Sequence, residues 1–67
     1  VAAWSGEQVS VWLGTTGYPQ YVAAFRENDI DGLALISLGR DDLTEMGVKS
    51  VGHRLAILRA RDAHGEA

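Results

Sequence analysis

The chain has no cysteine, a single proline and only five aromatic residues among its 67 residues. Without cysteine, neither a disulfide framework nor a cysteine zinc site can form, so this small fold must depend on its hydrophobic core. No apolar run approaches the roughly 18–20 residues that cross a bilayer. The first residues also lack the basic and apolar segments of a signal peptide. We therefore expect a globular domain that does not insert into membranes. Its expected location is the cytoplasm, set by whatever parent protein carries it.

Capping residues and glycines divide the chain into short segments with helical spacing of apolar residues. Ser5 and Gln8 have the spacing of a capping box, in which two side chains satisfy the first backbone groups of a helix. Ser50 has the chemistry of an N-cap for the last and longest segment. The five segments are expected to begin near Ser5, Pro19, Leu33, Asp41 or Asp42, and Ser50.

No stretch of the chain alternates between polar and apolar residues as a β-strand would. The sequence therefore predicts an all-α fold, a compact bundle of five helices. We expect one domain over residues 1–67, with an ordered core at about 4–61 and a frayed tail at 62–67.

The formal charge changes sign along the second half of the chain. Residues 26–48 carry two arginines against six carboxylates, a balance of −4, and residues 49–67 carry four cations against two carboxylates, a balance of +2. A small domain with an acidic and a basic patch can bind copies of itself head to tail. Such a contact builds rings if the rotation closes and filaments if it does not.

An ordered set of motifs extends over almost the whole chain. It consists of Trp4-Ser5, Val9-Ser10-Val11-Trp12-Leu13, Tyr21, Phe25, Asn28-Asp29-Ile30-Asp31-Gly32, Leu35, Leu38, Asp42-Leu43, Met46-Gly47-Val48, Gly52-His53-Arg54 and Ile57-Leu58. Together these motifs resemble the sterile alpha motif (SAM) domain family. Residues 47–54 look most similar to polymer-forming members such as those of Shank scaffolds and diacylglycerol kinase delta. The resemblance implies a five-helix interaction module. Arg61 stands where many members have an aliphatic residue, which predicts loose packing of the last helical turn.

The resemblance also implies two binding surfaces. The first, which we call the mid-loop surface, is commonly acidic and corresponds here to Asp29, Asp31, Asp41, Asp42 and Glu45. The second, the end-helix surface, is commonly basic with an apolar centre and corresponds to Lys49, Val51, His53, Arg54 and Leu55. The start of a helix favours an incoming carboxylate, because its N–H groups and dipole are positive there.

Leu55 is the predicted apolar centre of the end-helix surface. If Ile57 and Leu58 face the core, Leu55 lies about 60° from Leu58 and about 160° from Ile57 around the helix. Val51 lies on the same line one turn earlier, which favours an exposed apolar strip. The alternative is that Leu55 merely widens the buried stripe.

Two other kinds of partner remain open. The chain could bind one to one to a different SAM domain or to a signalling protein such as a kinase, using one surface only. It could also bind an RNA hairpin through the cations near the last helix. However, the loop at residues 14–17 has no basic residue, and the net charge of −3 opposes a polyanion. Self-association is the reading that we favour.

Signals for a metal site or for catalysis are weak. Glu27, Asp29, Asp31 and Gly32 match the start of a calcium loop, but Leu38 occupies the twelfth position, where a bidentate glutamate is required. The two histidines are eleven residues apart, and the serines have no His–carboxylate partner nearby in the sequence. A domain of this size also offers little room for a substrate pocket. We expect no enzymatic activity, no small-molecule substrate, no metal and no cofactor.

Overall fold

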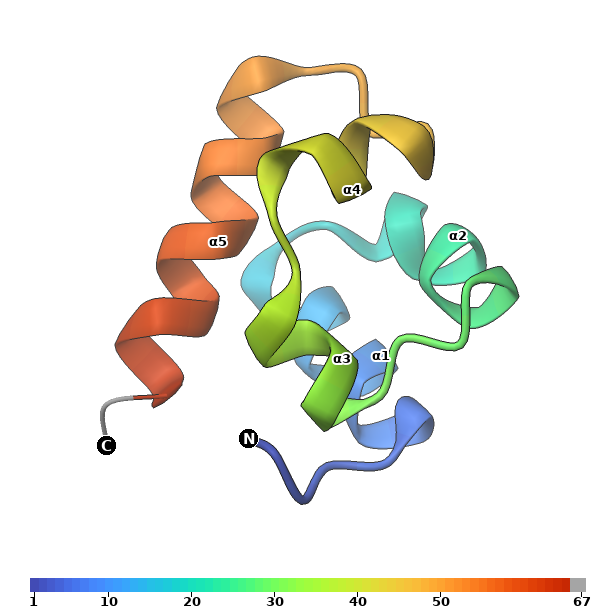
Figure 1. The fold of residues 1–67 in the computed structure, drawn as a ribbon, viewed down its shortest axis with the longest axis vertical. Helices are drawn as coiled ribbons and strands as arrows, with labels where there is room; N and C mark the ends of the chain where they lie inside the picture. The colour runs from blue at the N-terminus through green and yellow to red at the C-terminus, as the bar shows by residue number, and fades with distance from the viewer. Residues whose placement is uncertain (66–67) are drawn as a thin grey trace.

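The fold is a bundle of short helices, seen here in a computed structural model that describes residues 1–65 (Figure 1). Within that range the elements are α1 (Gly6–Thr16), the 3₁₀ helix η1 (Pro19–Tyr21), α2 (Val22–Glu27), α3 (Gly32–Ser37), α4 (Arg40–Glu45) and α5 (Val51–Gly65). The all-α prediction with five α-helices is confirmed. Figure 1 shows the N-terminus and the end of α5 at one end of the molecule and the start of α5 at the other.

The two predicted caps are present. The backbone N–H of Gln8 donates to Ser5 Oγ at 3.2 Å, and the Ser5 N–H donates to Gln8 Oε1 at 2.8 Å, which completes the capping box of α1. Ser50 Oγ accepts from the N–H of His53 at 3.2 Å and so caps α5. Each cap satisfies N–H groups that have no partner inside their helix.

Other helix boundaries differ from the prediction. Pro19 begins a 3₁₀ turn, and α2 follows it directly. Gly39 is the N-cap of α4 in place of Asp41 or Asp42, and Asp42 lies inside the helix, where its Oδ2 accepts from the Gly39 N–H at 2.9 Å. Helix α5 continues to Gly65, so residues 62–65 of the expected tail are helical. The remainder of that tail, residues 66–67, lies outside the described residues.

The core is formed by apolar side chains from every α-helix and from the α4–α5 connection. Phe25, Leu35 and Ile57 are fully enclosed at its centre. The full buried set is Val9, Trp12, Leu13, Phe25, Leu35, Leu38, Leu43, Val48 and Ile57. Burial of such side chains is the main favourable term in folding. The helical spacing of these residues therefore determines which faces of the helices point inward.

Gly32 marks the closest approach between the N-terminal segment and α3. Its N–H donates to the carbonyl of Trp4 at 2.9 Å. A Cβ atom at this position would lie 1.8 Å from the carbonyl oxygen of Val1 and 2.8 Å from the backbone nitrogen of Trp4. Only glycine can therefore occupy this position without movement of the backbone.

Arg61 does not leave the last turns of α5 loosely packed. Its side chain is 15% exposed, and its Nη1 donates to the backbone carbonyls of Leu35 and Leu38 in α3. Nη2 also pairs with Asp62 Oδ1 at 2.7 Å. The expectation based on the missing aliphatic residue is wrong, because hydrogen bonds to the end of α3 replace the apolar contact.

No helix in residues 1–65 is both long enough and apolar enough to span a membrane.

Candidate interaction surfaces

The five carboxylates of the mid-loop surface are all exposed. Asp29 and Asp31 lie in the connection between α2 and α3, and the other three belong to α4. Within residues 1–65 the ion pairs are Arg26–Glu7 and Arg61–Asp62, so none of the five is neutralised by a pair inside the molecule. The surface therefore keeps its negative potential, which is the sign that favours a cationic group.

The mid-loop surface also contains an open groove of about 310 Å³ that the sequence analysis did not predict. It lies between the α2–α3 connection, α3 and α4, and its lining includes the apolar residues Ile30, Ala34, Leu38 and Met46 beside the acidic residues Asp42 and Glu45. Ala34 lies in α3, and Leu38, four residues later, is the C-cap that follows the helix. That spacing was the available signal for an apolar floor.

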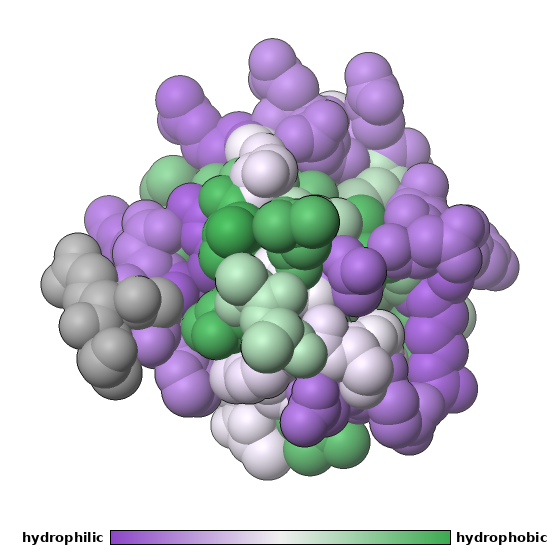
Figure 2. Space-filling model, turned by 60° about the horizontal axis from the view of Figure 1, so that its bottom comes forward, coloured by the Kyte–Doolittle hydropathy of each residue, from purple (hydrophilic) through white to green (hydrophobic). Residues whose placement is uncertain are grey.

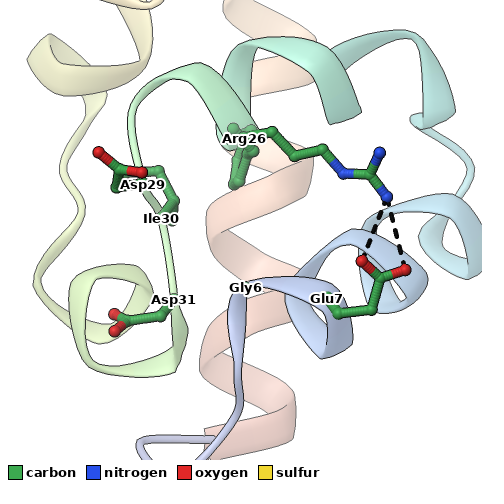
Figure 3. A pocket seen from close by; sticks show the side chains of 7 residues that line it. Gly6, Glu7, Arg26, Asp29, Ile30 and Asp31 are labelled. Carbon is green, nitrogen blue, oxygen red and sulfur yellow. Dashed lines mark hydrogen bonds and ion pairs between the residues drawn. The ribbon is translucent and has the colours of Figure 1, made fainter.

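Arg26 does not reduce the charge of the mid-loop surface. Its Nη2 lies 3.4 Å from Glu7 Oε2, and its Nε donates to Ser10 Oγ at 3.4 Å, so the guanidinium is directed toward α1. Arg26 and Glu7 line a cavity of about 410 Å³. Figure 3 shows its lining residues, with the carboxylates of Asp29 and Asp31 directed away from Arg26. The positive charge of Arg26 is therefore paired with Glu7 of α1, which is not part of the mid-loop surface.

Two of the mid-loop carboxylates have structural roles as well. Asp31 Oδ1 accepts from the N–H of Ala34 at 2.9 Å and is the N-cap of α3. Asp29 has a φ of 54°, in the left-handed region that Asp and Asn tolerate better than most residues. No cluster of three or more His, Cys, Asp or Glu side chains with metal-binding geometry occurs in the described part of the chain.

The end-helix surface centres on Lys49 and Val51, which are both exposed at the start of α5. Val51 is the first residue of the helix, and its relative exposure is 57%. The last residues before the helix, Val48 to Ser50, have no regular structure. An apolar side chain thus projects at the positive end of a helix dipole, beside a lysine.

The other members of the end-helix set are half-buried. His53 Nδ1 lies 2.6 Å from the hydroxyl of Tyr21, and its ring packs 5.0 Å from the ring of Tyr18. Arg54 Nη1 donates to the carbonyl of Val48 at 2.7 Å. These two residues hold the start of α5 on the rest of the bundle and contribute positive or polar surface at its edge.

Leu55 is less exposed than Val51. It is half-buried, so it lies at the edge of the buried stripe, as the helical-wheel angles predict. Val51 is the most exposed apolar side chain of the end-helix surface. Of the two candidate apolar residues, Val51 is therefore the more exposed.

Apolar side chains are also exposed away from these two surfaces. Figure 2 shows an apolar patch, bordered by hydrophilic residues, on the face that comes forward when the lower end of the molecule in Figure 1 is turned toward the viewer. Leu33 and Ile36 of α3 are 63% and 44% exposed, and Val11 of α1 is 61% exposed. Single exposed apolar residues are normal on a protein surface. Val11 has the same side chain as Val51 at similar exposure on another helix, so it serves as a matched reference for Val51.

Comparisons with known proteins agree with this architecture. A sequence model of the SAM domain (sterile alpha motif) family matches residues 1–64. The chain is 45% identical over 60 residues to the mitogen-activated protein kinase adapter protein MST50 of Pyricularia oryzae, which covers 90% of this chain and 12% of that protein. It is 49% identical over 57 residues to diacylglycerol kinase eta of Drosophila ananassae, which covers 85% of this chain and 3% of the kinase. The chain thus spans only a small part of the length of these relatives.

Proposed function

The chain belongs to the sterile alpha motif family of protein-interaction modules, and on this basis we propose that it self-associates head to tail. In this proposal the mid-loop surface of one copy receives the end-helix surface of the next. Each copy keeps one free surface of each kind, so the contact can repeat into polymers or closed oligomers. The domain would then act as a scaffold in the cytoplasm for whatever protein carries it.

The observation that carries this proposal is the complementarity between Val51 and the groove of the mid-loop surface. Val51 projects from the basic end of α5, and the groove offers an apolar floor with Asp42 and Glu45 among its lining. An apolar side chain entering the groove brings Lys49 toward those carboxylates. Charge then sets the orientation and the rate of encounter, and burial of the apolar centre supplies most of the affinity.

Exposed ion pairs alone would not support the contact. Each is typically worth about 0–1 kcal/mol because water and salt screen it. Removal of the apolar centre should therefore weaken the assembly more than removal of any one charge. This ranking separates the proposed contact from a purely electrostatic one.

The test is sedimentation of the purified domain over a concentration series, at low and at high salt. Wild-type mass should rise with concentration and fall with salt. Glu45→Lys should block the groove and Val51→Glu should block the end-helix surface, whereas Val11→Glu adds the same charge at a similarly exposed valine and should assemble normally. Because each blocked variant keeps one intact surface, an equimolar mixture of Glu45→Lys and Val51→Glu should form a defined dimer.

The alternative is a one-to-one complex with a different SAM domain or signalling protein. The similarity to a protein named as a kinase adapter favours this second candidate. A wild-type domain that stays monomeric at every concentration would overturn self-association and support this alternative. Pull-downs with wild type, Glu45→Lys and Val51→Glu would then identify which surface the partner uses. A mobility shift with an RNA hairpin, which we expect to be negative, tests the remaining possibility.

A further inference from the structure

Arg61 connects the C-terminal half of α5 to the end of α3. Figure 1 shows α3 beside this part of α5, and the two helices are in contact. The Arg61 guanidinium donates to the carbonyls of Leu35 and Leu38, which are among the last residues of α3 and its C-cap. The Leu35 carbonyl also accepts from the Leu38 N–H at 3.2 Å, whereas the Leu38 carbonyl lies past the end of the helix and needs a partner from elsewhere.

The residue that Arg61 holds also forms part of the groove. Leu38 contributes to the groove lining, and Gly39, the next residue, is the N-cap of α4. The Gly39 N–H donates to Asp42 Oδ2, and Asp42 also lines the groove. A continuous chain of contacts therefore runs from the Arg61 guanidinium through the α3–α4 corner to the acidic wall.

We propose that Arg61 is a positioning residue for the mid-loop groove. Arg61 is not among the residues that line the groove, so it acts by fixing the Leu38 carbonyl and thereby the direction in which α4 leaves the corner. This inference rests on the proposed head-to-tail contact. Loss of the guanidinium should weaken binding by the groove of the same copy and leave its end-helix surface, at the other end of α5, unaffected.

The two blocked variants allow the two surfaces of a copy to be measured separately. Val51→Glu provides a copy that can use only its groove, and Glu45→Lys provides a copy that can use only its end-helix surface. Arg61→Met added to the groove copy should raise the dissociation constant of the mixed dimer roughly three- to thirtyfold. The same substitution added to the end-helix copy should change it less than about twofold.

Arg59→Met is the matched control, because Arg59 is an exposed arginine on the same helix and the substitution removes the same charge. In the groove copy it should leave the dissociation constant near that of the unmodified pair. Equal weakening by Arg59→Met and Arg61→Met, or equal weakening by Arg61→Met in either copy, would overturn the proposal. If Arg61→Met loses its helical circular dichroism, Arg61→Lys replaces it in the experiment. Arg61→Lys should then raise the dissociation constant by a smaller factor, and only in the groove copy.

Hydrogen exchange of the monomeric Val51→Glu copy gives a readout that does not need association. Arg61→Met should speed exchange of the Gly39 amide about tenfold relative to Arg59→Met, because the corner opens more often when the Leu38 carbonyl is unpaired. Unchanged exchange at Gly39 and Asp42 would overturn the role of Arg61. If the Val51→Glu and Glu45→Lys copies, with no change at Arg61, fail to bind each other, the head-to-tail contact itself is overturned. The two failures are therefore distinct.

Discussion

The hydroxyl of Tyr21 lies 2.6 Å from Nδ1 of His53, which is 32 positions later in the chain. This contact joins η1 to the first turn of α5, and the ring of Tyr18 packs against the same imidazole. Val51, the apolar centre of the proposed end-helix surface, lies in that first turn. Tyr21 of η1 and its N-cap residue Tyr18 therefore support the proposed end-helix surface without being part of its exposed centre.

Tyr21→Phe should destabilise the domain by about 1 kcal/mol, because it removes the hydrogen bond to His53 and keeps the ring. A double-mutant cycle with His53→Ala, followed by urea unfolding of monomeric variants, should give a coupling energy of about 1 kcal/mol. Tyr18→Phe is the control for loss of a hydroxyl on a neighbouring ring and should change stability by less than about 0.5 kcal/mol. A coupling energy near zero would mean that the Tyr21–His53 contact contributes nothing to stability.

Gly32→Ala should destabilise the domain by about 3 kcal/mol or more, since the added Cβ collides with backbone atoms of Val1 and Trp4. A chain of 67 residues is expected to have a total stability of roughly 3–10 kcal/mol, so this loss removes from about a third to all of it and should lower the melting temperature sharply.

Gly14→Ala is the matched control for Gly32→Ala. Gly14 lies in α1, and an added Cβ there would meet no heavy atom within 4 Å. Alanine should therefore stabilise the helix by up to about 1 kcal/mol through its better helix propensity. Thermal unfolding monitored by circular dichroism checks both variants. Similar melting temperatures for the two would contradict the close approach at Gly32.

Charge reversal should have different consequences at two carboxylates of the mid-loop surface. Asp31→Lys removes the N-cap of α3 as well as a negative charge, which should cost about 1 kcal/mol of stability. Asp31→Ser keeps a capping oxygen and removes the charge, so it should recover most of that loss. Glu45→Lys reverses an exposed charge and should leave stability within about 0.5 kcal/mol of wild type. Urea unfolding separates the effects, and equal stability of Asp31→Lys and Glu45→Lys would contradict the capping role.

The sequence predicted those parts of the fold that depend on local chemistry. The capping box of Ser5 and Gln8 and the cap at Ser50 follow from residue types at fixed spacing, and both are present. The buried positions of Val9 and Leu13 follow from helical periodicity. The resemblance to the SAM family, now supported by the family match over residues 1–64, placed these segments in one architecture.

Contacts between distant parts of the chain could not be predicted in this way. Arg61 was expected to loosen its turn, because nothing in its neighbours indicates that the carbonyl of Leu38 lies within reach. The groove likewise requires α3 and α4 to meet at a particular angle, which periodicity does not specify. The exposure of Val51 relative to Leu55 depends on where the end of the α4–α5 connection packs. The assignment of the ten residues to two binding surfaces stays a prediction.

Self-association should make the stability of the wild-type domain depend on its concentration, because the contact binds folded copies only. One surface occupied by a partner at ten times its dissociation constant adds about 1.4 kcal/mol to the free energy of unfolding. For a domain of this size, that increment raises the melting temperature by roughly 5–11 °C.

Val51→Glu should abolish the dependence on concentration. Glutamate in the first turn of a helix is favoured by the dipole, so the monomer itself should not be weakened. Scanning calorimetry of wild type, Val51→Glu and Val11→Glu over a hundredfold concentration range measures this directly. Concentration dependence that persists in Val51→Glu would show that copies associate through a different surface, such as one that includes the exposed Leu33 and Ile36 of α3.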